Sequence, residues 1–210
     1  MGPSVIESLA PTPLVVPNLV DEPFDSWDPS LWLTGNHQLG RGWVRSPNVS
    51  VQGGQLVLAL PANTVDGGEV LSSRRVRYGT YEARLRASSA IGSITAFFLY
   101  EGARTGNDEV DIELIGGTRR VMFTTWVRGR ETHHEEVSLT FDPWAAMHDY
   151  RIEYSRNVVR FFVDGVQLAQ FGDNLPSAQL HVMANAWWPT WLAGGPYASN
   201  DAAVIEWIRY

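Results

Sequence analysis

Short segments of alternating polarity, separated by turn residues, run through most of the sequence and restrict the folds that this chain can adopt. Tyr81–Arg86 alternates apolar and charged residues, as a half-buried strand does. Val158–Val163 and Val166–Phe171 flank an Asp-Gly pair, which is a strong signal for a tight hairpin turn. Apolar residues hardly ever recur at helical spacing over ten residues or more. The pattern predicts an all-β protein made of two packed antiparallel sheets.

The same pattern continues along the chain without a linker, an internal repeat or a shift in composition. Asn48–Val51 and Gln55–Leu60 flank two glycines and predict a second hairpin, and Ala203–Tyr210 predicts a last strand. The first twenty residues differ, because they contain four prolines. We interpret residues 1–18 as a disordered or expression-derived N-terminal segment and residues 19–210 as one domain.

Charge and cysteine usage exclude several classes of function. The 210 residues include 16 Lys and Arg against 23 Asp and Glu, a net charge of −7, which repels a nucleic-acid backbone. There is no cysteine, which excludes disulfides, thiolate metal sites and cysteine nucleophiles. No apolar stretch approaches the 18 residues of a membrane helix. The 9 Trp, 7 Tyr and 8 Phe are typical of a β-rich protein with an aromatic-lined site.

The segment Asp108–Gly116 concentrates acidic residues on one side of a predicted strand. Because successive side chains point to opposite faces, Glu109, Asp111 and Glu113 share one face, while the three aliphatic residues between and after them share the other. Like charges this close repel each other, and nothing in local structure requires them. Such proximity raises the pKa of one carboxyl and leaves another ionised. The alternative is a solvated acidic face without a function.

One protonated and one ionised carboxyl are what glycoside hydrolysis requires. Residues i and i+4 lie ~13 Å apart along a strand, whereas a retaining enzyme needs carboxyl groups about 5–5.5 Å apart. Two Glu side chains on a concave strand can lean together and close this gap. A regular strand lacks the wrapped oxygen ligands of a calcium or magnesium site, so we expect no metal here. We expect none at His133 and His134 either, because adjacent strand residues point in opposite directions.

Asp108–Gly116 resembles the active-site strand of glycoside hydrolase family 16, whose signature is E-x-D-x-E, and in particular its licheninase branch, where a D-E-I-D-I-E-F-L-G run occurs. Similar segments follow in family order over residues 70–210, namely Tyr81–Ser89, Ser93–Tyr100, Val158–Val166, Met183–Trp187 and Ile205–Tyr210. The resemblance implies a concanavalin-like β-jelly-roll, a sandwich of two curved antiparallel sheets with a cleft on the concave face. Residues 19–210 are then a single catalytic domain.

The resemblance implies that Glu109 is the nucleophile, Glu113 the general acid/base and Asp111 an assisting carboxylate between them. The implied activity is that of a retaining endo-β-glucanase, which hydrolyses β-1,4 linkages in mixed-linkage β-1,3-1,4-glucan by double displacement. Xyloglucan-acting or β-1,3-glucan-acting hydrolases and transglycosylases of the same family stay open as alternatives. A non-catalytic carbohydrate-binding module or lectin is the alternative from another class.

The resemblance also implies which residues contact the substrate. Asn107 replaces a licheninase Trp, Thr124 replaces an Asn, Arg41 is the counterpart of another cleft Asn, and Trp126 stands in the place of a Tyr. Trp187, Trp188 and Trp191 form an aromatic cluster. We expect Trp187 to face the cleft, and we leave it undecided whether Trp188 and Trp191 lie at the rim of the cleft or in the core. The full expected set is Glu82, Arg84, Phe98, Tyr100, Asn107, Trp126, Asn185, Trp187 and Arg41.

Cofactors, partners and location follow from the same reasoning. No cofactor is expected. Glu206 matches a licheninase Asp near a structural calcium site, so a structural Ca²⁺ on the convex face is left as an alternative. The expected partner is a β-glucan polysaccharide, with no nucleic acid and no membrane, and the protein is expected to be a monomer. The start of the sequence has no basic stretch followed by the apolar core of a secretory signal. We therefore expect a secreted, extracellular enzyme on the basis of its polymeric substrate alone.

Overall fold

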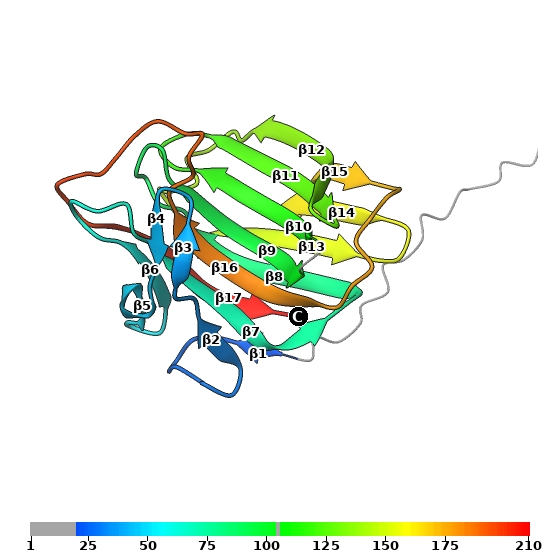
Figure 1. Cartoon of the computed structure of the whole chain (residues 1–210), viewed down its shortest axis with the longest axis horizontal. Helices are drawn as coiled ribbons and strands as arrows, with labels where there is room; N and C mark the ends of the chain where they lie inside the picture. The colour runs from blue at the N-terminus through cyan, green and yellow to red at the C-terminus, as the bar shows by residue number, and fades with distance from the viewer. Residues whose placement is uncertain (1–19, 104–105) are drawn as a thin grey trace, which may run out of the picture.

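The structure of the chain is a computed structural model that describes residues 20–103 and 106–210. In this part of the chain the strands form two large sheets and one small one (Figure 1), and the helical structure is limited to the 3-10 turn η1 (Ser46–Asn48). The prediction of an all-β sandwich is confirmed. The interpretation of residues 1–18 lies outside the described residues. No helix in the described ranges has the length and apolar character needed to cross a membrane.

The first sheet has seven strands and contains the acidic segment in β10, its third strand from one edge. Its order is β12-β11-β10-β9-β16-β7-β2, and all neighbours pair antiparallel. In Figure 1 this sheet lies in front, with β10 between β9 and β11. The strands are β2 (Trp32–Thr34), β7 (Gly68–Val76), β9 (Ile94–Ala103), β10 (Gly106–Ile115), β11 (Arg120–Val127), β12 (Arg130–Ser138) and β16 (Leu180–Trp187).

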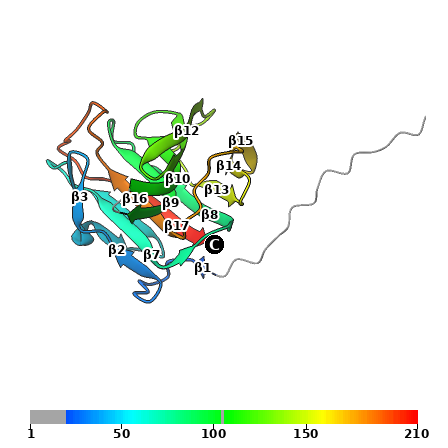
Figure 2. The same cartoon turned by 45° about the vertical axis from the view of Figure 1, so that its right-hand side comes forward.

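The second sheet has eight strands in the order β15-β14-β13-β8-β17-β6-β5, with β1 pairing to the end of β17. It lies behind the first sheet, as the turned view shows (Figure 2). The strands are β1 (Asp21–Glu22), β5 (Val49–Val51), β6 (Leu56–Leu60), β8 (Gly79–Arg86), β13 (His148–Tyr154), β14 (Val159–Val163), β15 (Val166–Phe171) and β17 (Asp201–Arg209).

A small hairpin of β3 (His37–Leu39) and β4 (Gly42–Val44) stands against one end of the seven-stranded sheet (Figure 1). The backbone N–H of Arg41, at its turn, donates a hydrogen bond of 2.8 Å to the carbonyl of Trp188, just after β16. Through this contact the hairpin forms a wall beside the outer face of the sheet.

The two predicted hairpins are confirmed, with boundaries within one residue. The turn between β14 and β15 places Asp164 at φ 48° and Gly165 at φ 79°, and the turn between β5 and β6 places Gly53 at 58° and Gly54 at 74°. Two successive left-handed residues give the twist that antiparallel strands require in a tight hairpin.

The core lies between the two sheets and is filled by the apolar half of each alternating strand. Val110, Ile112 and Leu114 of β10 are at most 1% exposed, and they anchor the acidic strand from below. Phe123 of the first sheet meets Phe161 of the second with ring centroids 5.0 Å apart. Burial of this face therefore fixes the register of β10 and turns its acidic residues outward.

A second apolar cluster covers the opposite, outer face of the seven-stranded sheet. The eight-stranded sheet packs against the other face, so this cluster is not part of the core between the two sheets. It forms an apolar surface on the outer side of the seven-stranded sheet. The half-buried rings of Tyr100 and Trp187 pack against it. Its buried members are Ile94, Ala96, Phe98, Ile115, Met122 and Met183.

Candidate active site

The outer face of the seven-stranded sheet carries a cleft of about 810 Å³, and the acidic residues of β10 lie on its floor. Glu109, Asp111 and Glu113 all line it, as the strand alternation predicts. Most of the remaining lining comes from the neighbouring strands, from the β3–β4 hairpin and from the loop after β16. These lining residues are His37, Leu39, Glu69, Ala96, Phe98, Tyr100, Asn107, Met122, Thr124, Trp126, Glu131, His134, Glu136, Met183, Asn185, Trp187 and Trp191.

Strand register gives each carboxylate a different pair of neighbours. Glu109 lies between Tyr100 of β9 and Trp126 of β11. Glu113 lies between Ala96 and Met122, which are both apolar. The central Asp111 is 3% exposed and pairs across with Phe98 and Thr124. The two glutamates therefore share one cleft but sit in chemically different surroundings.

The pKa values of the three carboxyl groups all rise, and burial is the largest cause for each. Desolvation raises the pKa of Glu113 to about 8, helped by the charges of Glu109 and Glu131. Desolvation also raises the pKa of Glu109, to about 7, but hydrogen bonds from Asp111 and Asn107 oppose it. The pKa of Asp111 lies well above its usual range because the group is buried beside two like charges. Because they lie on one face of one strand, the three groups titrate as a coupled set.

A fourth acidic residue, Glu69 of β7, lies at one end of the cleft and was missed by the sequence reasoning. It is 3% exposed, and its two carboxylate oxygens contact His37 Nε2 at 2.9 Å and Asn185 Nδ2 at 3.2 Å. Asn185 Oδ1 is buried and has no hydrogen-bond partner among the described residues. One feature of the sequence could have pointed to Glu69: it is the single charged residue at the apolar start of its strand. The structure shows that its neighbour Val70 is fully buried.

Six of the nine expected substrate contacts line the cleft. They come from β9, β10, β11 and β16, which are neighbours in the seven-stranded sheet. Trp187 lines the cleft as expected, Trp188 is 2% exposed in the core, and Trp191 is 57% exposed at the rim. The six residues are Phe98, Tyr100, Asn107, Trp126, Asn185 and Trp187.

The predictions for Glu82 and Arg84 are wrong. Both residues face outward, as the alternation of Tyr81–Arg86 predicts, but β8 belongs to the eight-stranded sheet, whose outer face lies away from the cleft. There Arg84 pairs with Asp149 at 2.8 Å, and Glu82 lies 3.9 Å from Arg151. Strand parity assigns a side chain to one face of its own sheet, and it does not say which of the two sheets the strand joins.

The prediction for Arg41 is also wrong, because its side chain does not line the cleft. Arg41 Nη1 donates a 2.7 Å hydrogen bond to the carbonyl of Gly194, and its guanidinium lies 5.3 Å from the centre of the Trp188 ring. This half-buried side chain holds the loop after β16 against the β3–β4 hairpin. Arg41 therefore supports the cleft wall without reaching its surface.

The two adjacent histidines of β12 point in opposite directions, as predicted. His134 lines the cleft, whereas His133 stacks on Phe171 with ring centroids 4.7 Å apart. Within the described residues, no group of three or more His, Cys, Asp or Glu side chains is arranged to hold a metal ion.

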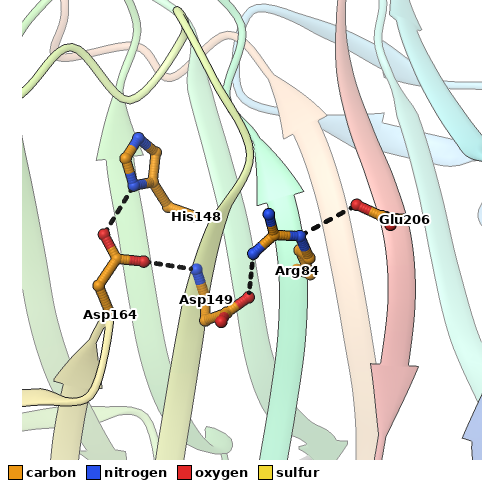
Figure 3. Close-up of polar contacts among 5 residues, drawn as sticks. All are labelled: Arg84, His148, Asp149, Asp164 and Glu206. Carbon is orange, nitrogen blue, oxygen red and sulfur yellow. Dashed lines mark hydrogen bonds and ion pairs between the residues drawn. The ribbon is translucent and has the colours of Figure 1, made fainter.

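The sequence left a structural calcium site near Glu206 on the convex face as an alternative. In the structure Arg84 lies there between two carboxylates (Figure 3). Arg84 Nε donates to Glu206 at 3.0 Å, and its Nη1 donates to Asp149 at 2.8 Å. These contacts place a positive charge beside the carboxylate of Glu206. A calcium ion there would have to displace this exposed ion pair.

A jelly-roll sandwich whose cleft floor carries two glutamates on either side of an aspartate is the architecture of a glycoside hydrolase. The sequence profile described as "Glycosyl hydrolases family 16" matches residues 40–209, and the chain belongs to this family.

Several relatives match nearly the whole chain. The Beta-glucanase of Bacillus amyloliquefaciens is 31% identical over 204 residues, which cover 90% of this chain and 85% of the relative. The solved Bacillus licheniformis beta-glucanase superposes with a TM-score of 0.84 at 27% identity, covering 93% of this chain and 98% of the other. A prokaryotic beta-1,3-1,4-glucanase (lichenase) from a mouse hindgut metagenome superposes with a TM-score of 0.83 at 26% identity, covering 91% and 97%.

Proposed function

We propose that this protein is a retaining endo-β-glucanase that hydrolyses β-1,4 linkages in mixed-linkage β-1,3-1,4-glucan by double displacement. The observation that carries the proposal is the position of Glu109 and Glu113 on the cleft face of one strand, with Asp111 between them. The names of the relatives, beta-glucanase and lichenase, support the substrate class.

The different surroundings of the two glutamates support different roles. Glu113, among apolar neighbours, keeps its proton and donates it to the glycosidic oxygen as the C–O bond breaks. The Glu109 carboxylate attacks the anomeric carbon and forms a glycosyl ester. Glu113, now ionised, takes a proton from water, and the water attacks the same carbon and releases Glu109. Burial beside two like charges raises the pKa of Asp111, which favours its protonated form and so limits the negative charge in the cleft.

The rest of the cleft suits a neutral polysaccharide. The rings of Phe98, Tyr100, Trp126 and Trp187 offer flat apolar surfaces on which sugar rings stack. The buried acceptor Asn185 Oδ1 can take a hydrogen bond from a sugar hydroxyl. The acidic lining disfavours a polysaccharide that carries negative charges.

We further propose that the enzyme acts outside the cell as a monomer and without a cofactor. A glucan polymer is too large to enter a cell intact, and the proposed steps use only carboxyl side chains and water.

A reducing-sugar assay on barley β-glucan, laminarin, xyloglucan and agarose, followed by linkage analysis of the products, tests the proposal. We expect cleavage of barley β-glucan and its loss in Glu109→Gln and Glu113→Gln, each of which keeps the circular dichroism spectrum of the folded protein. Glu135→Gln on the exposed part of β12 is the matched control and keeps full activity. Full activity in either cleft variant would refute the catalytic assignment, and binding without cleavage by the wild type would indicate a lectin.

A further inference from the structure

Asn107 lies on the cleft face of β10, two residues before Glu109, and its side chain contacts that carboxylate. Its Nδ2 donates a hydrogen bond to Glu109 Oε2, and the residue is half-buried in the cleft lining. This is the position where the resemblance leads one to expect a tryptophan. An indole there offers a stacking surface, whereas the amide offers a hydrogen-bond donor aimed at a carboxylate.

The ionised carboxylate of Glu109 selects the Nδ2 end of the Asn107 amide as its partner. The backbone carbonyl of Asn107 accepts a 2.8 Å hydrogen bond from the N–H of Gly129, which closes the turn between β11 and β12 against β10. The side-chain oxygen Oδ1 lies on the side of this glycine, 3.8 Å from where a Cβ on Gly129 would stand. Rotating the amide by half a turn would place Oδ1 against a carboxylate oxygen, which pairs two acceptors.

Glu109 therefore lies between two donors on its own strand. Asn107 donates to one carboxylate oxygen, and burial raises the pKa of the neighbouring Asp111 so that it favours the protonated form, which can donate as well. Hydrogen bonds from both residues lower the pKa of Glu109 against the larger effect of desolvation. The remaining titratable groups that line the cleft are His37 of β3, Glu69 of β7, Tyr100 of β9, Glu113 of β10, and Glu131, His134 and Glu136 of β12.

We propose that Asn107 is a positioning residue for the reaction: its amide holds the Glu109 carboxylate in place for attack. The same hydrogen bond stabilises the ionised form of that carboxylate. The inference rests on the proposed role of Glu109 as the nucleophile. Asn107 touches the nucleophile and acts through it, so it contributes to the rate of glycosyl-ester formation more than to binding of the glucan.

The test is the pH dependence of covalent labelling by an activated 2-deoxy-2-fluoro β-glucan oligosaccharide with a dinitrophenolate leaving group. Its leaving group departs without help from an acid, so the labelling rate reports on the ionisation of Glu109 and not on that of Glu113. Attack by the Glu109 carboxylate forms the ester and releases dinitrophenolate. Intact-mass and peptide mass spectrometry locate the label.

Asn107→Leu preserves the shape of the side chain and removes the donor. We expect the acidic limb of its labelling profile to move up by about one pH unit, and labelling at pH 6 to slow by about tenfold, as loss of one hydrogen bond to a charged group predicts. We expect Asn107→Gln, which keeps an amide donor, to restore most of the rate. We expect the KM for β-glucan to change less than kcat in Asn107→Leu.

Each outcome separates this inference from the proposed function. If the wild type is not labelled, or is labelled at another residue, the assignment of Glu109 as the nucleophile is wrong. If the wild type is labelled at Glu109, and Asn107→Leu keeps the same pH midpoint and rate, the role of Asn107 is refuted and the proposed function stands. If Asn107→Leu does not fold, Asn107→Ala, which also lacks the donor, gives the same two outcomes.

Discussion

Replacing Glu113 by Gln is expected to stabilise the folded protein at alkaline pH while it abolishes activity. Glu113 lies between Ala96 and Met122, and burial raises the pKa of its carboxyl to about 8. A folded-state pKa above the unfolded value means that the group contributes its full stability below about pH 4.5. This contribution is lost as the pH rises to about 8, because the unfolded chain releases the proton first.

The size of this change in the free energy of unfolding follows from the pKa shift of Glu113. At 1.36 kcal/mol per pKa unit, a rise from 4.5 to about 8 corresponds to an upper bound of about 5 kcal/mol at pH 9. The glutamine amide that replaces the carboxyl is also buried, and its lost hydration destabilises the folded state in turn. Only part of the upper bound of about 5 kcal/mol is therefore gained. We therefore expect Glu113→Gln to gain about 2–4 kcal/mol over the wild type at pH 9 and little at pH 4.

Urea unfolding of both proteins between pH 4 and pH 9 measures this gain directly. For a domain of this size the gain at pH 9 corresponds to a melting temperature about 5–12 °C above the wild type. Glu135→Gln, which removes an exposed carboxylate of β12, is expected to stay within about 0.5 kcal/mol at every pH. An unfolding free energy that changes with pH equally in the wild type and in Glu113→Gln would refute the reasoning.

The remaining predictions concern activity and specificity. The pH profile of kcat/KM should be bell-shaped with its maximum between about 7 and 8, because Glu109 must be ionised and Glu113 protonated, and a maximum below pH 5 would contradict the assignment. Azide should restore turnover of an activated aryl glycoside by Glu109→Ala and give the inverted product; if azide has no effect and the wild type inverts, the roles need to be exchanged. Trp187→Ala should raise KM at a stability cost of about 1–2 kcal/mol, whereas a loss of about 3–5 kcal/mol would place this Trp in the core. Asn107→Trp should sharpen the preference for mixed-linkage glucan over other β-glucans by roughly two- to twelvefold, because one added stacking contact is worth about 0.5–1.5 kcal/mol. Unchanged ratios of kcat/KM between the substrates would show that this position does not govern specificity.

The strands and the acidic row could be predicted because both depend on local periodicity. Alternation alone places Val110, Ile112 and Leu114 in the core and the carboxylates opposite them, and the Asp164-Gly165 pair fixes a hairpin through backbone sterics. These features need no knowledge of which strands lie side by side.

The errors arose where the answer depends on long-range pairing. Arg84 alternates correctly within β8, but β8 pairs with β13 and β17 in the sheet that does not carry the cleft. Glu69 enters the site because β7 pairs with β16, more than a hundred residues later. Such partners are set by the packing of the whole sandwich and leave no signal in the local sequence.

The anomeric configuration of the first product tests the central claim most directly. Proton NMR of barley β-glucan during the first minutes of hydrolysis, before mutarotation, distinguishes the two anomers. Double displacement through Glu109 and Glu113 predicts that the β-anomer of the new reducing end appears first. Initial formation of the α-anomer would show a single displacement by water and would contradict the account.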